Sequence, residues 1–526
     1  MPRVLVSDPL HAEGIALLQT ETQVDVKTGP TPQELLRLIP DYEALVVRSE
    51  TKVTKEVLEA GKRLQVVGRA GVGVDNIDLD AATRLGIAVV NAPTATSIAA
   101  AEHTIAMMMA LARHVPQAYA SLRQGKWERS AFVGVEVRDK VLGIIGLGRI
   151  GFEVARRAQG LQMRLIGYDP FVGPDYARRL GVELVTLDEL LAQSDFITLH
   201  TPLTDATYNL IGRKELARAK PGVRILNCAR GGLIDEEALL EALTKGRVAG
   251  AALDVFAKEP PGENPLLAHP QVIATPHLGA STTEAQASVG RQVAEQVLMV
   301  LRGEPAPYTA NAVSALPEAH KVLAPYIPVC TVIGKIASQL AEGQLTAITI
   351  HYQGEIARHD TSMLKAACLM GILGPVTSER VNLVNASLLA SQRGLRIVEE
   401  KQENGEEHYG SLVTVRLHTL QGTMSATGAV MRGAPHIVKV DDYWIDFVPS
   451  SPYLLFTHHQ DQPGLIGAVG TITGKHDINI SFMEVGRLAP RGQATMVLGL
   501  DDTVPEAVLA EIRGISHIGT AKLVAL

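Results

Sequence analysis

The sequence predicts an α/β fold in which one parallel-sheet domain is inserted into another, followed by two smaller α+β domains. Short apolar strands alternate with helical stretches as far as residue 302. A Pro- and Ala-rich segment, GEPAPYTANAVSALPE at 303–318, then marks a boundary, and longer alternating strands follow it. At 526 residues the chain also exceeds what one hydrophobic core usually supports.

The first series of elements predicts βαβ units in a parallel sheet. Alternation of apolar strands with helices implies a sheet that is covered by helices on both faces. Helices are expected at 32–39 and 55–61. The strands are expected at 4–8, 24–26, 44–49, 64–71 and 88–93.

A long apolar helix, TSIAAAEHTIAMMMALARHV at 96–115, separates the two series. Such a helix is expected to be buried between domains or in a subunit interface. A further helix at 282–302 leads the chain back to the first domain. We therefore expect a first domain made of 1–96 plus 283–315, with a second Rossmann-like domain, 97–282, inserted into it. The strands of the second domain are expected at 141–151, 163–170, 195–203, 223–232, 250–256 and 272–278.

Beyond the boundary, two α+β domains are expected at 316–450 and 453–526. The last of them reads strand, helix, strand, strand, helix, strand, which is a ferredoxin-like βαββαβ order. In the domain before it, helices are expected at 328–343 and 377–394, and strands at 346–354, 411–420 and 436–448.

Composition argues against several classes of protein. A net charge of -7 argues against a nucleic-acid surface, for which a basic stripe would be expected. No apolar window approaches the roughly 20 residues that span a bilayer. The three cysteines, Cys228, Cys330 and Cys368, are far apart and form no CxxC pair, so we expect no metal site and a reducing, cytoplasmic environment.

A dinucleotide site is predicted between the first strand and helix of the second series. The glycines of Gly146-Leu-Gly148-Arg-Ile-Gly151 follow an apolar strand and open a helix, a context that makes the motif specific. The helix N-terminus, which begins with Arg149 and Ile150, would hold the diphosphate. Asp169 ends the next strand and would bind the adenosine ribose, which favours NAD over NADP; the alternative is a structural Asp.

Three titratable side chains fall at the carboxyl ends of strands, where ligands bind in open α/β sheets. They are Arg230, Glu259 and His277. An Arg holds a carboxylate with two bonds, a His takes an alcohol proton near neutral pH, and an acid orients the imidazole. A lone His at a strand end is more often structural, but this combination predicts 2-hydroxyacid oxidation.

Four segments resemble the D-isomer-specific 2-hydroxyacid dehydrogenase family: LGIIGLGRIG, KPGVRILNCARGGLIDEEALLEAL, ALDVFAKEPP and TPHLGAST. The resemblance covers residues 44–300 and implies that Arg230, Glu259 and His277 are the catalytic residues. It implies that 97–282 binds NAD and that the discontinuous domain binds substrate. For Cys228 a backbone role is as good an interpretation as a side-chain role. The residues implied around the nicotinamide and its ribose are Thr201, Cys228, Ala229, Asp254 and Gly279.

The substrate is expected to be an anion with two charged groups. Arg48 and Arg69 end strands that face the cleft, and the turn that contains Gly71 could bind a carboxylate. Lys126 and Arg129 could reach across a subunit boundary. These cations favour a phosphorylated hydroxyacid, with Arg48 as the first candidate for the phosphate; the alternative is solvated surface arginines.

The domain order resembles the long form of this family, with an intervening domain at 316–450 and an ACT domain at 453–526. That implies oxidation of 3-phospho-D-glycerate to 3-phosphohydroxypyruvate with NAD, the first step of L-serine synthesis. The alternatives are a dehydrogenase of another 2-hydroxyacid, such as glycerate, lactate or 2-hydroxyglutarate, or a non-catalytic NAD-sensing protein.

The last domain is expected to bind a regulator. Its loop HHQDQPG resembles the effector motif of ACT domains, which implies L-serine as a feedback effector bound by His459, Asp461 and Asn479. The loop alone could equally be a structural turn. Because ACT domains pair edge to edge and the 96–115 helix suits a dimer interface, we expect a homotetramer.

Overall fold

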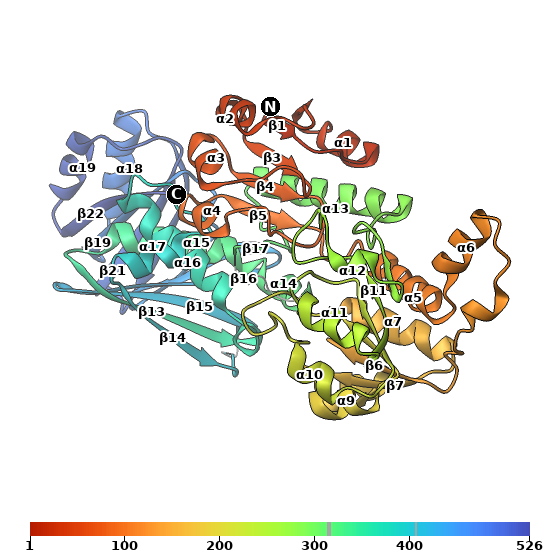
Figure 1. Cartoon of the computed structure of the whole chain (residues 1–526). Coiled ribbons are helices and arrows are strands. Elements are labelled where there is room, and N and C mark those ends of the chain that lie inside the picture. Colours follow the sequence, from red (N-terminus) through yellow and green to blue (C-terminus); the bar gives the residue numbers. More distant parts are fainter. Residues whose placement is uncertain (313–316, 406–407) are drawn as a thin grey trace.

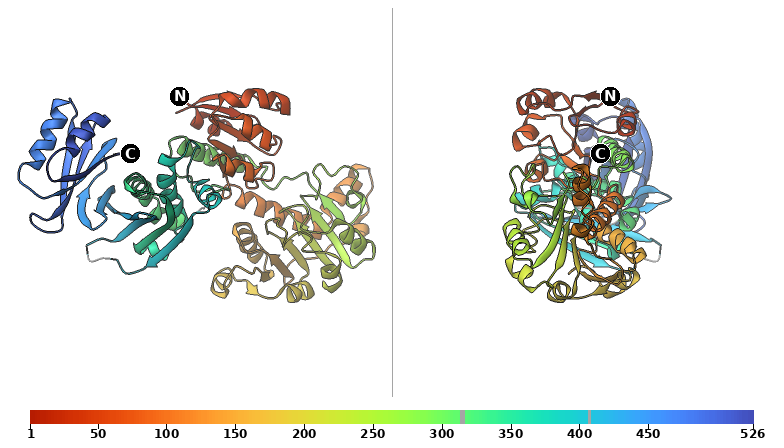
Figure 2. Two further views of the ribbon diagram at one scale, coloured as in Figure 1. Left: turned by 90° about the vertical axis from the view of Figure 1, so that its left-hand side faces the viewer. Right: turned by 45° about the vertical axis from the view of Figure 1, so that its right-hand side comes forward.

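The computed structural model describes residues 1–312, 317–405 and 408–526. They form four sheets, one after another along the chain, and the expected fold class is confirmed. In Figure 2 the last domain lies at one end of the molecule and the second α/β domain at the other. Within the described residues, no helix is long and apolar enough to cross a membrane. The expected boundary between 315 and 316 lies outside the described residues.

The first sheet is parallel, with the strand order β2-β1-β3-β4-β5. Helix α13 returns to this sheet from far along the chain and packs on α1 and β4 (Figure 1). A Cβ on Gly14 would lie 2.7 Å from the Gly290 oxygen, so glycine lets these two helices approach closely. The elements are β1 (Arg3–Val6), α1 (Ala12–Leu18), β2 (Gln23–Val26), α2 (Pro32–Leu38), β3 (Ala44–Val47), α3 (Lys55–Ala60), β4 (Val66–Arg69), α4 (Leu79–Arg84), β5 (Ala88–Asn91) and α13 (Thr283–Leu301).

The second sheet is also parallel, with the order β12-β11-β10-β9-β6-β7-β8. The order reverses between β6 and β9, which places the carboxyl ends of these strands at a ligand-binding switch point. Helix α5 packs on α7 and on β11. The elements are α5 (Ser97–Ala112), β6 (Val141–Ile145), α7 (Arg149–Gly160), β7 (Arg164–Tyr168), α8 (Pro174–Arg179), β8 (Glu183–Leu184), α9 (Leu187–Gln193), β9 (Phe196–Leu199), α10 (Arg213–Arg218), β10 (Val223–Asn227), α11 (Glu236–Thr244), β11 (Val248–Leu253), α12 (Pro265–Ala268) and β12 (Val272–Ala274).

The apolar helix expected at 96–115 is confirmed as α5, which ends a few residues earlier than expected and is followed by a second helix. Helix α5 ends at Ala112, His114 takes a left-handed conformation with φ 53°, and α6 (Val115–Arg123) follows. Pro116 explains the break, because it has no N–H to donate to the Ala112 carbonyl. That carbonyl instead accepts a hydrogen bond from the Val135 nitrogen at 2.9 Å.

The intervening domain is a mixed sheet of order β14-β13-β15-β16-β17-β18, in which β13 and β14 are parallel and the other pairs antiparallel. Its helices α15 and α16 pack against each other and cover the sheet. The elements are α14 (Pro317–Leu323), α15 (Tyr326–Leu340), β13 (Leu345–Gly354), α16 (Ser362–Leu373), α17 (Ala386–Gln392), β14 (Arg396–Gln402), β15 (Ser411–Thr419), β16 (Gly422–Met431), β17 (Ala434–Val440) and β18 (Tyr443–Phe447).

The helix expected at 377–394 is much shorter, because only α17 is helical. The preceding residues form a loop in which Asn382 and Asn385 bond to nearby backbone groups, the local competition that disfavours a helix. The same loop contacts the first domain: Arg380 donates to the Leu64 oxygen at 2.9 Å and Asn382 to the Gly86 oxygen at 2.6 Å.

The last domain has the expected ferredoxin-like order. Its strands lie in the order β20-β21-β19-β22, and every neighbouring pair is antiparallel. Leu454, Phe456 and Val524 belong to the same buried cluster as the helices of the intervening domain, so the two domains share a core. The elements are β19 (Tyr453–Gln460), α18 (Leu465–Lys475), β20 (Ile480–Arg487), β21 (Gln493–Leu500), α19 (Glu506–Arg513) and β22 (Ile518–Ala525).

Candidate active site

The glycine-rich loop joins β6 to α7, and each of its three glycines has a different environment. Gly146 has φ 92°, and a Cβ there would lie 2.7 Å from the His200 oxygen. A Cβ on Gly151 would lie 2.1 Å from the Gly146 oxygen, whereas nothing lies within 4 Å of one on Gly148. The loop is therefore closed on the protein side and open at Gly148, which suits a diphosphate at the N-terminus of α7.

Asp169 lies at the rim of this loop. Its Oδ2 accepts a hydrogen bond from the Leu147 nitrogen and its Oδ1 from the Phe171 nitrogen, both at 2.9 Å. Thr201 Oγ1 is buried beside Gly146 and has no partner among the described residues. A bound dinucleotide could accept or donate a hydrogen bond at the unpaired Thr201 hydroxyl, and its diphosphate could occupy the open space at Gly148. The residues therefore fit NAD.

The two remaining residues of the motif lie at the start of α7. The Arg149 guanidinium lies over the Tyr308 ring, 5.7 Å from its centroid, and Ile150 is half-buried. Tyr308 follows α13, so Arg149 contacts the segment that leaves the first domain.

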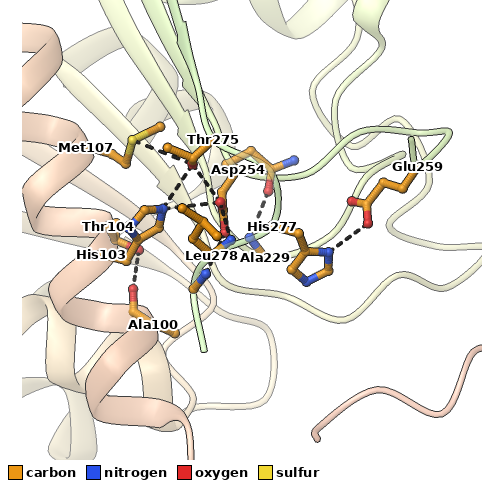
Figure 3. A network of polar contacts seen from close by, with 12 residues as sticks. Ala100, His103, Thr104, Met107, Ala229, Asp254, Glu259, Thr275, His277 and Leu278 are labelled. Atoms are coloured by element: carbon orange, nitrogen blue, oxygen red, sulfur yellow. Dashed lines mark hydrogen bonds and ion pairs between the residues drawn. The ribbon is translucent and has the colours of Figure 1, made fainter. Parts of the chain in front are cut away.

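The His277 imidazole and the Glu259 carboxylate are hydrogen-bonded at the carboxyl edge of the second sheet. The Nδ1 atom of His277 lies 2.7 Å from Oε2 of Glu259, and the two side chains are 51% and 38% exposed (Figure 3). The other Glu259 oxygen accepts a bond from the Phe256 nitrogen at 3.2 Å. Because the contact uses Nδ1, Nε2 is the nitrogen available to exchange a proton with a ligand.

Arg230 follows β10 and reaches the first domain. A Cβ on Gly231 would lie 1.8 Å from the Phe256 oxygen, so glycine allows the turn after β10 to lie against the end of β11. Arg230 donates to the Ala229 oxygen at 2.7 Å, and its Nε lies 3.7 Å from Oδ2 of Asp75. The guanidinium therefore lies between the two α/β domains.

Two further arginines of the first domain, Arg69 and Arg48, lie near Arg230. The Arg69 side chain lies against Gly71, and its Nε is buried without a partner in the described part of the chain. Burial, together with the nearby charges of Arg230 and Arg48, lowers the pKa of Arg69 to about 10. Asp8 accepts a bond from the Arg48 nitrogen at 2.5 Å and fixes the end of β3. Three neighbouring guanidinium groups, one of them with a buried nitrogen that has no partner among the described residues, favour an anionic ligand.

Asp254 and Cys228 lie at the carboxyl edge of the second sheet, below the turn that contains His277. The Asp254 side chain is 1% exposed and accepts bonds from Thr275, Leu278 and Gly279. Burial raises the pKa of Asp254, but bonds from His103, Thr275 and Leu278 outweigh it, so the carboxylate stays ionised. Burial, together with the charge of Asp254, raises the pKa of Cys228 to about 12, so its thiol stays protonated.

Arg129 is not brought to the cleft within one chain. It opens the short helix η2 (Arg129–Phe132), is exposed, and follows α6, which projects from the outer side of the second domain (Figure 1). Lys126 is exposed in the same loop.

One chain also does not assemble the expected effector residues. Strands β19 and β20 both run antiparallel to β21, so Asp461 after β19 and Asn479 before β20 lie at opposite ends of the sheet. Asp461 accepts a bond from Arg487 at 3.3 Å, and Asn479 donates to Asp501 at 2.6 Å. His459 is 4% exposed, and burial lowers the pKa of its imidazole.

The sequence interpretation missed His103, Thr275 and Asp75, which contact Asp254 or Arg230. For His103 a signal existed, because it lies four residues from both Ala99 and Met107 on the buried face of α5. The contacts of Asp75 cross between domains and have no signal in the local sequence. Among the described residues, no cluster of His, Cys, Asp and Glu could hold a metal ion.

Three family models match the chain in sequence order. The D-isomer specific 2-hydroxyacid dehydrogenase NAD binding domain matches residues 105–279. The D-3-phosphoglycerate dehydrogenase intervening domain matches 322–441, and the ACT domain matches 453–517. The first match contains the glycine-rich loop and the residues Arg230, Glu259 and His277 described above.

Relatives match over the whole length. D-3-phosphoglycerate dehydrogenase from Synechocystis is 47% identical over 100% of this chain and 95% of its own length. The enzyme of that name from Methanocaldococcus jannaschii is 47% identical over 98% of each chain. A glyoxylate reductase structure from Paecilomyes thermophila covers 59% of this chain and 98% of its own, at 34% identity and a TM-score of 0.55. The chain therefore belongs to the D-3-phosphoglycerate dehydrogenase family, within the D-isomer-specific 2-hydroxyacid dehydrogenases.

Proposed function

We propose that the chain oxidises 3-phospho-D-glycerate to 3-phosphohydroxypyruvate with NAD, the first step of L-serine synthesis. The observation that carries this proposal is the convergence of Arg48, Arg69 and Arg230 from two domains beside the His277–Glu259 pair. A substrate with a carboxylate and a phosphate matches such a cationic cleft. The names of the full-length relatives support the same substrate.

In this mechanism His277 is the general base. Its Nε2 accepts the proton of the C2 hydroxyl, and Glu259 stabilises the imidazolium that forms. NAD, held by the glycine-rich loop and Asp169, supplies the hydride acceptor. Arg230 binds the C1 carboxylate through its planar fork and stabilises the C2 oxygen as it becomes a carbonyl.

The parts of the chain are assigned accordingly. Residues 1–96 plus 283–315 would bind substrate, 97–282 would bind NAD, 316–450 would form the intervening domain and 453–526 the ACT domain. The return of α13 to the first sheet and the packing of α5 on β11 support this division. We place the enzyme in the cytoplasm, because its three buried cysteines are free.

The direct test is an initial-rate assay of NADH formation with 3-phospho-D-glycerate, D-glycerate, D-lactate and D-2-hydroxyglutarate. We expect the phosphorylated acid to give the highest kcat/KM. Similar kcat/KM values for all four acids would contradict the phosphate assignment while leaving a 2-hydroxyacid dehydrogenase. NAD binding without turnover of any acid would favour a sensing protein instead.

Replacing Arg48 by Met is expected to change substrate selectivity. Loss of a charge-assisted bond to phosphate should lower kcat/KM for 3-phospho-D-glycerate about 50-fold. The value for D-glycerate, which has no phosphate, should change little. Arg84→Met, at an exposed position in α4, is the control and should leave both values unchanged. An equal loss with both acids would show that Arg48 does not bind the phosphate.

We propose a homotetramer built from nucleotide-domain dimers and paired ACT domains. No residue of α6 is buried, and several of its apolar side chains face outward. Tyr119 is 63% and Leu122 56% exposed, and Trp127 just beyond the helix is 77% exposed. Clustered exposed aromatic and aliphatic side chains favour a protein interface. In a partner subunit the adjoining Arg129 could then complete the substrate site.

A charge on α6 should therefore disrupt assembly. Leu122→Asp should halve the mass measured by sedimentation velocity, because a buried unpaired carboxylate opposes the interface. Leu420→Asp, in which an equally apolar side chain is 73% exposed on the intervening domain, should leave the mass unchanged. An unchanged mass for Leu122→Asp would exclude α6 from the interface.

We also propose L-serine as a feedback effector between paired ACT domains, with His459 and Asp461 from one subunit and Asn479 from the other. The separation of Asp461 from Asn479 within one chain supports a shared site. Added L-serine should slow 3-phospho-D-glycerate oxidation, and Asp461→Ala should weaken the effect. Asp502→Ala, an exposed carboxylate that follows β21 at the other end of the sheet, should not. A wild-type rate that is insensitive to L-serine would contradict this proposal.

A further inference from the structure

A buried network connects Asp254 to the turn that carries His277 (Figure 3). The Asp254 carboxylate accepts bonds from the Leu278 nitrogen at 2.7 Å and the Gly279 nitrogen at 2.9 Å. These are the two residues directly after His277. His277 itself has φ 56°, a conformation that a non-glycine residue keeps only when its surroundings hold it. The carboxylate therefore fixes the path of the catalytic turn.

A buried carboxylate can hold the turn only if it stays ionised and correctly oriented. His103 Nε2 lies 3.2 Å from Asp254 Oδ1 and 3.1 Å from Thr275 Oγ1, and Thr275 in turn donates to Oδ1 at 2.6 Å. Over residues 1–312, 317–405 and 408–526, His103 is the one basic side chain within 4.0 Å of this carboxylate. Removing the His103 side chain would take one hydrogen-bond donor away from the Asp254 carboxylate, which water hardly reaches.

His103 comes from a different part of the molecule than the turn. It lies on α5, the helix that follows the crossing from the first domain into the second. The same helix lies close under the turn, since a Cβ on Gly279 would be 3.9 Å from Ala100. Met107, one helical turn beyond His103, contacts Thr275 at 3.9 Å. The His103 side chain therefore joins the connecting helix to the catalytic edge.

We propose that His103 is a positioning residue for the reaction: through Asp254 it holds the 277–279 turn and thereby orients His277. This inference rests on the proposed function, because it concerns the base of that reaction. His103 does not contact the substrate or exchange its proton. Its Nε2–H group donates to Asp254 and Thr275. A substitution must preserve the bond to Asp254 if the turn is to keep its position.

The test compares two amide substitutions of similar polarity. Gln places its side-chain nitrogen where the histidine Nε2 lies, whereas the shorter Asn reaches only the Nδ1 position. We expect His103→Gln to keep kcat within about 3-fold of the wild type and His103→Asn to lower kcat about 30-fold, the size expected for a misplaced base. The KM for NAD should change less than kcat in both. Met107→Leu, which keeps the packing volume beside Thr275, should match the wild type.

Hydrogen–deuterium exchange provides a readout that does not depend on activity. If His103 holds the turn, His103→Asn should speed exchange of the Leu278 and Gly279 amides at least 10-fold, while His103→Gln should not. Equal kcat values for the Asn and Gln variants, or unchanged exchange in both, would overturn the proposal. If the protein oxidises no 2-hydroxyacid but exchange is still faster in His103→Asn, the role of His103 in holding the 277–279 turn would stand. Only the proposed function would then be rejected.

Discussion

Replacing His277 by Ala should abolish turnover while leaving NAD binding intact. A positioned general base contributes about 10²–10⁴-fold to such a reaction, so we expect kcat to fall about 1000-fold. His277 lies at the carboxyl end of β12 and pairs with Glu259, whereas the cofactor loop lies between β6 and α7. The affinity for NADH, measured by fluorescence titration, should therefore change little.

The matched control is His269→Ala. His269 lies just before β12, at the end of the strand away from the cleft, and its Nδ1 accepts a bond from the Gln271 nitrogen. That variant should keep wild-type kcat. Glu259→Gln should show an intermediate loss, because it keeps the size of the side chain but loses the charge that stabilises the imidazolium. Normal turnover by His277→Ala would remove His277 as the base.

Replacing Arg230 by Lys should cause the second large loss, although the charge is kept. Lysine has no planar fork, so it cannot hold a carboxylate by two parallel bonds or reach the C2 oxygen at the same time. We expect kcat/KM to fall about 100-fold with every 2-hydroxyacid tested. A loss restricted to phosphorylated acids would place Arg230 at the phosphate instead.

Arg224→Lys controls for the substitution itself. Arg224 lies at the start of β10, whereas Arg230 follows the end of the same strand. The Arg224 guanidinium lies 5.5 Å from the centroid of the Phe196 ring. It does not reach the cleft, so its variant should keep wild-type kcat/KM. Comparable losses in both variants would mean that the Arg230 effect reflects damage to the sheet.

The parts of the fold that the sequence predicted well are those with local signals. The strand–glycine loop–helix unit around Gly146 has its own backbone requirements, and the structure places it at the predicted point. His277 and Glu259 were predicted from their positions after strands, and the structure brings them to 2.7 Å. The carboxyl ends of the strands of one parallel sheet lie at the same edge. Two residues that each gave a weak signal after a strand were therefore correctly predicted to lie together.

The parts that were missed depend on tertiary contacts or on weak local signals. Helix α16, SMLKAACLMGIL, is apolar on nearly all sides and has no helical periodicity to detect. Strand β14, RIVEEKQ, is largely exposed and charged at its end, so it lacks the alternation of a half-buried strand.

The same distinction holds within the site. Arg69 and Arg48 were predicted from strand ends, but their common cleft with Arg230 needs the packing of two domains. The link between His103 and Asp254 joins residues 151 positions apart along the chain, and no sequence motif encodes it. In the proposed tetramer, Arg129, Asp461 and Asn479 would act in sites shared with a second subunit, which the fold of one chain cannot test.

The most direct test of the central claim is the ratio of kcat/KM for 3-phospho-D-glycerate to that for D-glycerate. The two acids differ only in the phosphate, and in the proposed mechanism both present the same hydroxyl to His277 and the same carboxylate to Arg230. If the arginines of the first domain bind the phosphate, the ratio should be at least about 100 in the wild type. A ratio near one would contradict the account, because the cationic cleft would then contribute nothing to substrate choice.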